Sequence, residues 1–161
     1  MPSKKKTLPQ KLEYSAGAVI FRFEKGEREY LMLNYGAGHW EFARGHIEGD
    51  ETEMETAKRE IWEETGIKTL KFIKGFRDTF TFSFQHRGNL ITKEVTFFIA
   101  EVKSRQVTLS SPEHRGYTWA PYQTAKKLAT FDNAKNLLTD VEEFLKLSKD
   151  KKLTWQPRRK R

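Results

Sequence analysis

The most informative segment of the chain is residues 45–67, which read GHIEGDETEMETAKREIWEETGI. Thr52 and Glu55 form a T-x-x-E capping box, which predicts that a helix begins there. Gly66 is placed to end this helix, because glycine tolerates the left-handed conformation that helix ends often require. The stretch therefore predicts a loop, one helix of about three turns and a stop.

The predicted helix carries two different faces. At about 100° per residue, one face gathers apolar side chains that can pack on a core: Met54, Ala57 and Ile61. A separate arc gathers three carboxylates: Glu60, Glu63 and Glu64. Their repulsion costs roughly 0.2–0.5 kcal/mol per like-charged pair, and a divalent cation would offset it. Acid-rich helices are usually just solvated, but oxygen ligands without nearby His or Cys would select Mg²⁺ or Mn²⁺.

The spacing of the whole run resembles the Nudix box, the signature of hydrolases that act on nucleoside diphosphates linked to another moiety. Nine positions of that pattern are filled with no departure. They are Gly45, Glu51, Arg59, Glu60, Ile61, Glu63, Glu64, Gly66 and Ile67. The resemblance implies a loop–helix–loop that holds a catalytic metal through Glu60, Glu63, Glu64 and Gly45. It further implies that Arg59 orients the acids and that Glu51 supports the metal shell.

Length and composition set the broad class. A chain of 161 residues suits one domain with a sizeable core. The sequence has no cysteine, which excludes a disulfide framework and fits a reducing compartment. It also lacks an apolar stretch near the roughly 18–20 residues that a membrane span needs, and its N-terminus lacks the apolar segment of a signal peptide. We expect a cytoplasmic monomer with no membrane contact.

The net charge of +8 is concentrated at the two ends of the chain. Residues 1–11 carry four lysines and no acids, and residues 149–161 carry seven basic residues and one acid. The body, residues 12–148, is therefore mildly acidic. We expect a disordered basic N-terminal tail (1–11), a catalytic domain (12–148) and a basic C-terminal tail (149–161). Such tails usually do nothing specific, but they can bind RNA weakly.

The remaining pattern predicts a mixed α/β order. Expected strands are 15–23, 30–33, 70–86, 90–102 and 117–120, with a turn at Gly88-Asn89. A short helix is expected near 123–128, and Asp132 should cap a last helix. That helix should pack through Ala134, Leu137, Leu138, Val141, Phe144 and Leu145. These elements suit an α/β fold with a mixed β-sheet between helices, and the resemblance implies the Nudix α/β/α sandwich.

Outside the box, residues 14–147 resemble the asymmetric diadenosine tetraphosphate hydrolase branch of the family. The segments that carry this are GHWEFARGH (38–46), SSPEHRGYTW (110–119) and TFD (130–132). The branch implies that the polyphosphate is bound by His39, Arg44 and Lys93. It also implies that Glu113 joins the metal and water site, and that Phe131 with Phe82, or Phe84, clamps an adenine.

Each of these residues has a plainer interpretation when taken alone. Phe82, Phe84 and Phe131 would ordinarily belong to a core, and Lys93 could be an edge-strand charge that blocks sheet association. We interpret three further histidines as packed or surface residues with no role in the site: His46, His86 and His114. The chain departs from the branch at Ala43-Arg44, where a proline and a lysine are usual. Arginine keeps the charge and can grip phosphate through two parallel hydrogen bonds.

The implied activity is metal-dependent hydrolysis of a phosphoanhydride, with diadenosine tetraphosphate cleaved to AMP and ATP. Either Glu63 or Glu113 could take the proton from the attacking water. Two alternatives stay open. The first is an RNA 5′-end pyrophosphohydrolase whose basic tails hold RNA. The second is a binding protein that senses nucleotides without turnover.

Overall fold

The computed structural model describes residues 7–36, 38–110 and 112–148. Over these residues the chain forms eight strands and three helices. The strands are β1 (Gln10–Glu24), β2 (Glu27–Tyr35), β3 (Trp40–Glu41), β4 (Ala43–His46), β5 (Lys71–Phe72), β6 (Asp78–His86), β7 (Asn89–Glu101) and β8 (His114–Pro121). The helices are α1 (Glu53–Thr65), α2 (Tyr122–Leu128) and α3 (Asp132–Leu147).

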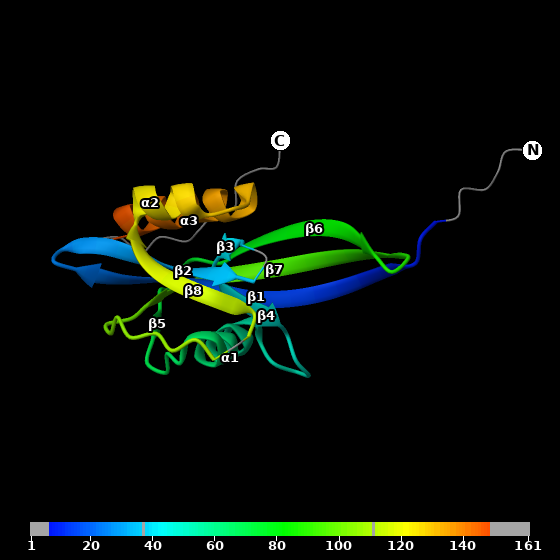
Figure 1. Cartoon of the computed structure of the whole chain (residues 1–161), viewed down its shortest axis with the longest axis horizontal. Helices are drawn as coiled ribbons and strands as arrows, with labels where there is room; N and C mark the ends of the chain where they lie inside the picture. The colour runs from blue at the N-terminus through cyan, green and yellow to red at the C-terminus, as the bar shows by residue number, and fades with distance from the viewer. Residues whose placement is uncertain (1–6, 37, 111, 149–161) are drawn as a thin grey trace, which may run out of the picture.

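The elements form three layers, with α1 on one face of the sheet and α2 with α3 on the other (Figure 1). Alternation along β1 feeds both layers, because successive side chains of a strand point to opposite faces. Val19 and Phe21 join the core under α2 and α3, whereas Ala18 and Ile20 join the core under α1. The predicted α/β/α sandwich around a mixed sheet is confirmed.

Strand β1 is the centre of the sheet. It runs parallel to β7 from Gln10↔Leu90 to Phe21↔Glu101, and it is antiparallel to β2 near its end. Strand β4 also pairs with β1, antiparallel, between Ser15↔His46 and Ala18↔Ala43. The N-terminal half of β1 and the β6–β7 hairpin extend together away from the body of the molecule (Figure 1).

Helix α1 begins and ends as predicted. Thr52 caps it, with both hydrogen bonds of the capping box to Glu55 present, and Gly66 follows the last turn in the left-handed conformation at φ 72°. Ala57 and Ile61 are fully buried. The prediction for Met54 was wrong, because its side chain remains 44% exposed.

The strands differ from the prediction mainly in their ends. Strand β1 begins at Gln10, so residues 10 and 11, assigned to the N-terminal tail, belong to the sheet. The long strand expected over 70–86 is broken into β5 and β6, and the hairpin turn lies at Arg87-Gly88 with positive φ at both residues. Residues 1–6 and 149–161 of the expected tails lie outside the described residues.

Helix α3 packs through the six apolar residues that the sequence predicts, and all six are buried. The expected Asp132 cap was wrong. Asp132 is the first residue of the helix, and Phe131 occupies the cap position with no side-chain hydrogen bond. Within the described residues, no helix is both long and apolar enough to cross a bilayer.

Strand β4 leaves no room for a side chain at Gly17 of strand β1. A Cβ at Gly17 would lie 2.0 Å from the Ala43 carbonyl oxygen. Gly17→Ala should therefore lower the free energy of unfolding by about 1–3 kcal/mol, the usual cost of overpacking. Urea unfolding measures this, with Gly116→Ala as the matched control because a Cβ there meets nothing within 4 Å. Equal stability of the two variants would contradict the prediction.

Candidate active site

Arg59 holds the acids of α1 and of the preceding loop in one hydrogen-bonded cluster. Its guanidinium donates to both carboxylate oxygens of Glu51 at 2.8 and 3.0 Å, to Glu60 at 2.8 Å and to Glu63 at 3.1 Å. It also donates to the His46 carbonyl oxygen at 2.9 Å. The bond to Glu51 is the largest cause that raises the pKa of Arg59. The same bond is the largest cause that lowers the pKa of Glu51, to about 2. Arg59 therefore fixes where the carboxylates point.

Glu64 lies in a different environment from the other acids of the helix. Its side chain is buried, which corrects the expectation that all three carboxylates lie off the packed face. Burial, followed by the charge of Glu60, raises the pKa of Glu64 to about 9. Its Oε2 atom has no hydrogen-bond partner and lies 3.9 Å from Nε2 of His114. A buried carboxylate oxygen without a donor is costly, so this atom suits a cation.

Gly45 brings strand β4 against the acidic helix. A Cβ at this position would lie 2.0–2.3 Å from the carboxyl atoms of Glu60, so no larger residue fits there without displacing Glu60. Burial raises the pKa of Glu60 as well, although the Arg59 bond opposes the shift. Glu113 is exposed on the loop before β8, and its carbonyl oxygen accepts from the Gly36 N–H at 2.7 Å.

The described residues do not yet form a complete metal cage, since no group of three or more acids or histidines among them is arranged to hold an ion. The donor set nevertheless fits a hard cation. Glu60 and Glu64 lie one turn apart beside Gly45, and Glu64 offers the unsatisfied oxygen. Oxygen-only donors favour Mg²⁺ or Mn²⁺ over softer metals.

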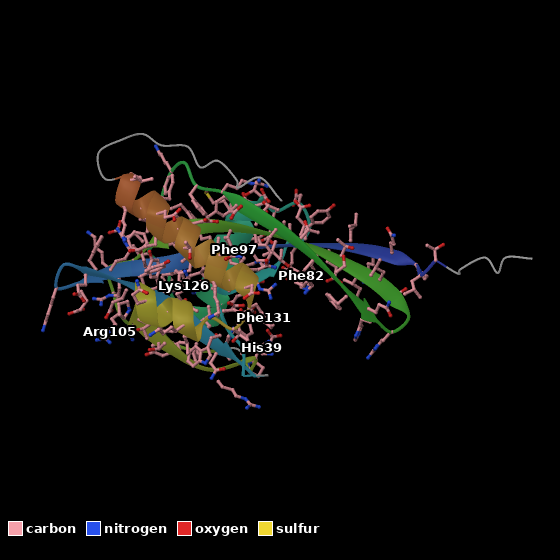
Figure 2. The ribbon with its side chains drawn as sticks, turned by 90° about the horizontal axis from the view of Figure 1, so that it is seen from above. His39, Phe82, Phe97, Arg105, Lys126 and Phe131 are labelled. Atoms are coloured by element: carbon pink, nitrogen blue, oxygen red, sulfur yellow. The ribbon has the colours of Figure 1, made fainter. Side chains whose placement is uncertain are left out.

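An aromatic cavity lies on the opposite face of the sheet from α1. It has a volume of about 510 Å³ and is lined by His39, Glu41, Phe42, Arg44, Phe80, Phe82, Phe97, Phe131, Asp132, Asn133, Ala134 and Leu137. His39, Phe82 and Phe131 gather near the start of α3, whereas Arg105 lies away from them (Figure 2). The rings of His39 and Phe131 meet edge to face at 4.7 Å. The cavity suits a flat aromatic group such as a purine.

Strand β4 connects the cavity to the acids. Arg44 lines the aromatic cavity, while the next residue, Gly45, faces Glu60 on the other side of the sheet. Within the cavity, Arg44 pairs with Glu41 at 3.2 Å. One strand thus presents a cation to the cavity and a gap to the acidic helix in consecutive positions.

The structure distinguishes between the candidates that the sequence left open. Phe82 lines the cavity, whereas Phe84 lies outside the lining and stacks on Phe82 at 6.2 Å. Lys93 also lies outside the lining, with its Nζ 3.8 Å from Glu13 and 5.9 Å from the Phe84 ring. Its contact with phosphate stays a prediction.

The three histidines without an assigned role in the site differ in their surroundings. His114 is buried against the Tyr35 ring at 4.4 Å, and burial lowers its pKa. His46 contributes its carbonyl oxygen to Arg59, and His86 lies in the outer end of β6. Sequence reasoning missed Glu41 as a cavity residue, and strand alternation could not have found it, because the next residue, Phe42, lines the same cavity.

Comparison with known proteins identifies the family of the chain and relatives that cover most of it. The NUDIX domain family matches residues 11–141. The chain is 34% identical over 142 residues to the asymmetrical bis(5′-nucleosyl)-tetraphosphatase of Mus musculus, covering 81% of this chain and 94% of the mouse protein. The Caenorhabditis elegans protein of that name is 30% identical over 134 residues, covering 81% of this chain and 95% of the relative.

The fold comparison agrees. The crystal structure of a C. elegans Ap4A hydrolase binary complex superposes with a TM-score of 0.74 and 29% identity. The superposition covers 83% of this chain and 98% of that one.

The raised pKa of Glu64 predicts how stability depends on pH in metal-free protein. The folded state holds this proton up to about pH 9, whereas an unfolded glutamate releases it near its ordinary pKa of 4.5. The contribution of Glu64 to the free energy of unfolding should therefore be largest below pH 4.5 and fall as the pH rises toward 9. Urea unfolding in EDTA measures this, and Glu64→Gln should remove part of the slope. An identical slope in both proteins would contradict the prediction.

Proposed function

The chain belongs to the Nudix family of hydrolases, and we propose that it hydrolyses dinucleoside polyphosphates, cleaving diadenosine tetraphosphate to AMP and ATP. The observation that carries the proposal is the arrangement around β4. Its consecutive residues Arg44 and Gly45 join an aromatic cavity to an acidic helix. The relatives named as bis(5′-nucleosyl)-tetraphosphatases match 81% of this chain, which supports the proposal.

The acidic side would hold one or more divalent cations, Mg²⁺ with Mn²⁺ as a substitute. Glu60 and Glu64 are the principal ligands, with Glu63 and the backbone of Gly45 beside them. A bound cation supplies neutralisation of phosphate charge and acidifies the attacking water. Arg59 is a positioning residue here, because its hydrogen bonds set the directions of Glu51, Glu60 and Glu63.

Glu63 and Glu113 are the two candidates for the general base. Glu63 is about half exposed and is bound on one oxygen by Arg59, which leaves its other oxygen able to accept a proton. Glu113 lies on the loop before β8, and its carbonyl oxygen is hydrogen-bonded to Gly36. Gly36 precedes His39 by three residues. Either carboxylate would remove the proton from water as it attacks phosphorus, and the nucleotide would leave with the cleaved bond's electrons.

The cavity would bind one adenosine of the substrate. Phe82 and Phe131 would stack on the base, while His39 and Arg44 line the same cavity and would contact the phosphates that lead toward the acids. Arg44 must then exchange its ion pair with Glu41 for phosphate oxygens, a geometry to which its guanidinium is well suited. Lys93, on β7, would add positive charge outside the cavity lining.

Product identity on a panel of substrates tests this proposal. Purified protein with Mg²⁺ should release AMP and ATP from diadenosine tetraphosphate faster than it hydrolyses nucleoside triphosphates, ADP-ribose or capped RNA. Glu60→Gln should lower kcat by about two orders of magnitude or more, because it removes a charged ligand from the cation site. Its melting temperature should hold, since Glu60 is only partly buried and Gln keeps its size and an oxygen that can accept from Arg59.

Glu27→Gln is the matched control for this substitution, because Glu27 is exposed at the start of β2. It should leave kcat unchanged. Near-normal turnover by Glu60→Gln with Mg²⁺ would refute the assignment of the metal ligands. Nucleotide binding with no turnover of any substrate would instead identify a nucleotide sensor.

Removal of residues 1–6 and 149–161 tests the role of the basic ends and leaves β1, which begins at Gln10, intact. On diadenosine tetraphosphate, kcat/KM should change by less than about threefold, because salt screens exposed charges beyond roughly 8–10 Å. Triphosphorylated RNA should be hydrolysed poorly by both forms. If the full chain cleaves RNA 5′ ends efficiently, and truncation weakens this while flattening its salt dependence, then RNA is the substrate.

A further inference from the structure

We propose that Thr130 is a positioning residue that fixes the base-binding ring of Phe131 against His39 by binding the backbone of Trp40. This inference rests on the proposed function and adds a residue that neither touches substrate nor belongs to the acidic helix. The contact joins two segments that are far apart in the sequence, at the end of the cavity where base and phosphate would meet.

The contact consists of two hydrogen bonds in opposite directions. The Trp40 N–H donates to Oγ1 of Thr130 at 2.8 Å, and the Thr130 N–H donates to the Trp40 carbonyl oxygen at 3.2 Å. A pair of bonds between the same two residues restrains both their separation and their relative rotation. A single hydrogen bond would leave the relative rotation of the two residues free.

Residues on either side of this contact line the cavity, but the two that form it do not. His39 precedes Trp40, Phe131 follows Thr130, and both belong to the lining, whereas Trp40 and Thr130 are absent from it. The His39 and Phe131 rings meet at 4.7 Å directly beside the contact, and Figure 2 shows them next to each other. Thr130 can therefore act on a ligand only through its neighbours.

The backbone around Phe131 is already anchored on both sides. The Ala129 N–H donates to the Ala125 carbonyl oxygen at 2.9 Å, which ends α2, and the Lys135 N–H donates to the Phe131 carbonyl oxygen at 3.0 Å, which begins α3. Between these anchors, the side chain of Thr130 provides a link to the His39 segment. Loss of this link should loosen the relation between the two segments without unfolding either helix.

Two variants of one position separate this role from simple packing. Thr130→Val keeps the branched shape but removes the acceptor, whereas Thr130→Ser keeps the hydroxyl. Thr130→Val should weaken ADP binding, measured by titration calorimetry without metal, by about three- to tenfold, as expected for one hydrogen bond that water can partly replace. Thr130→Ser should bind nearly as the parent protein does, and the melting temperatures of both should stay close to the parent's.

The double variant with Phe131→Ala tests whether Thr130 acts through that ring. If it does, Thr130→Val should weaken ADP binding much less when Phe131 is already alanine, so the two effects are not additive. Ser104→Ala is the control, because the Ser104 hydroxyl likewise accepts a backbone N–H, from Gln106 at 3.1 Å, and neither residue lines the cavity. It should not change ADP binding.

Additive effects, or failure of Thr130→Ser to restore binding, would overturn the inference. A large fall in the melting temperature of Thr130→Val, with unchanged ADP affinity, would also overturn it, because it would show a purely structural role. The proposed reaction fails differently, through a lack of AMP and ATP as products in the parent protein. Binding of ADP is measured independently of turnover, so the two failures are distinguishable.

Discussion

The site depends on the narrow space in which β4 lies. On one side a Cβ at Gly17 would meet the Ala43 carbonyl oxygen at 2.0 Å, and on the other a Cβ at Gly45 would meet the carboxylate of Glu60 at a similar distance. Two glycines, one on β1 and one on β4 itself, therefore let the strand lie between the central strand and the acidic helix. Arg44 lies between these two contacts, so its place in the cavity is set by backbone packing that a flexible loop could not supply.

Between the loop before α1 and the last turn of that helix, the protein creates two opposite electrostatic environments. Hydrogen bonds from Arg59 lower the pKa of Glu51 to about 2, whereas burial raises that of Glu64 to about 9. A buried carboxylate with one oxygen that lacks a hydrogen-bond donor is costly, and its neutralisation by a proton or by a cation is the expected outcome. Burial disfavours the ionised form of Glu64 in metal-free protein. The same burial would therefore strengthen the binding of a divalent ion to this carboxylate.

Local signals in the sequence predicted much of the fold but fewer of the contacts within the site. The capping box at Thr52, the stop at Gly66 and the apolar face of α3 depend on residues three or four apart, so the sequence shows them directly. The exposure of Met54 and the burial of Glu64 depend instead on what packs against α1. The link between Trp40 and Thr130 joins residues 90 positions apart, and no local pattern indicates such a pairing.

The wrong prediction for Asp132 is the most informative about function. Polar residues such as Asp are favoured at a helix cap and commonly add about 0.5–2 kcal/mol of stability there. At α3 the cap position instead holds Phe131, which forms no side-chain cap and remains 43% exposed. Departures from local preference tend to concentrate at functional sites. A large exposed ring at the start of a helix, held by the Thr130 contact and directed into a cavity, is consistent with a residue retained for binding a base at the expense of helix stability.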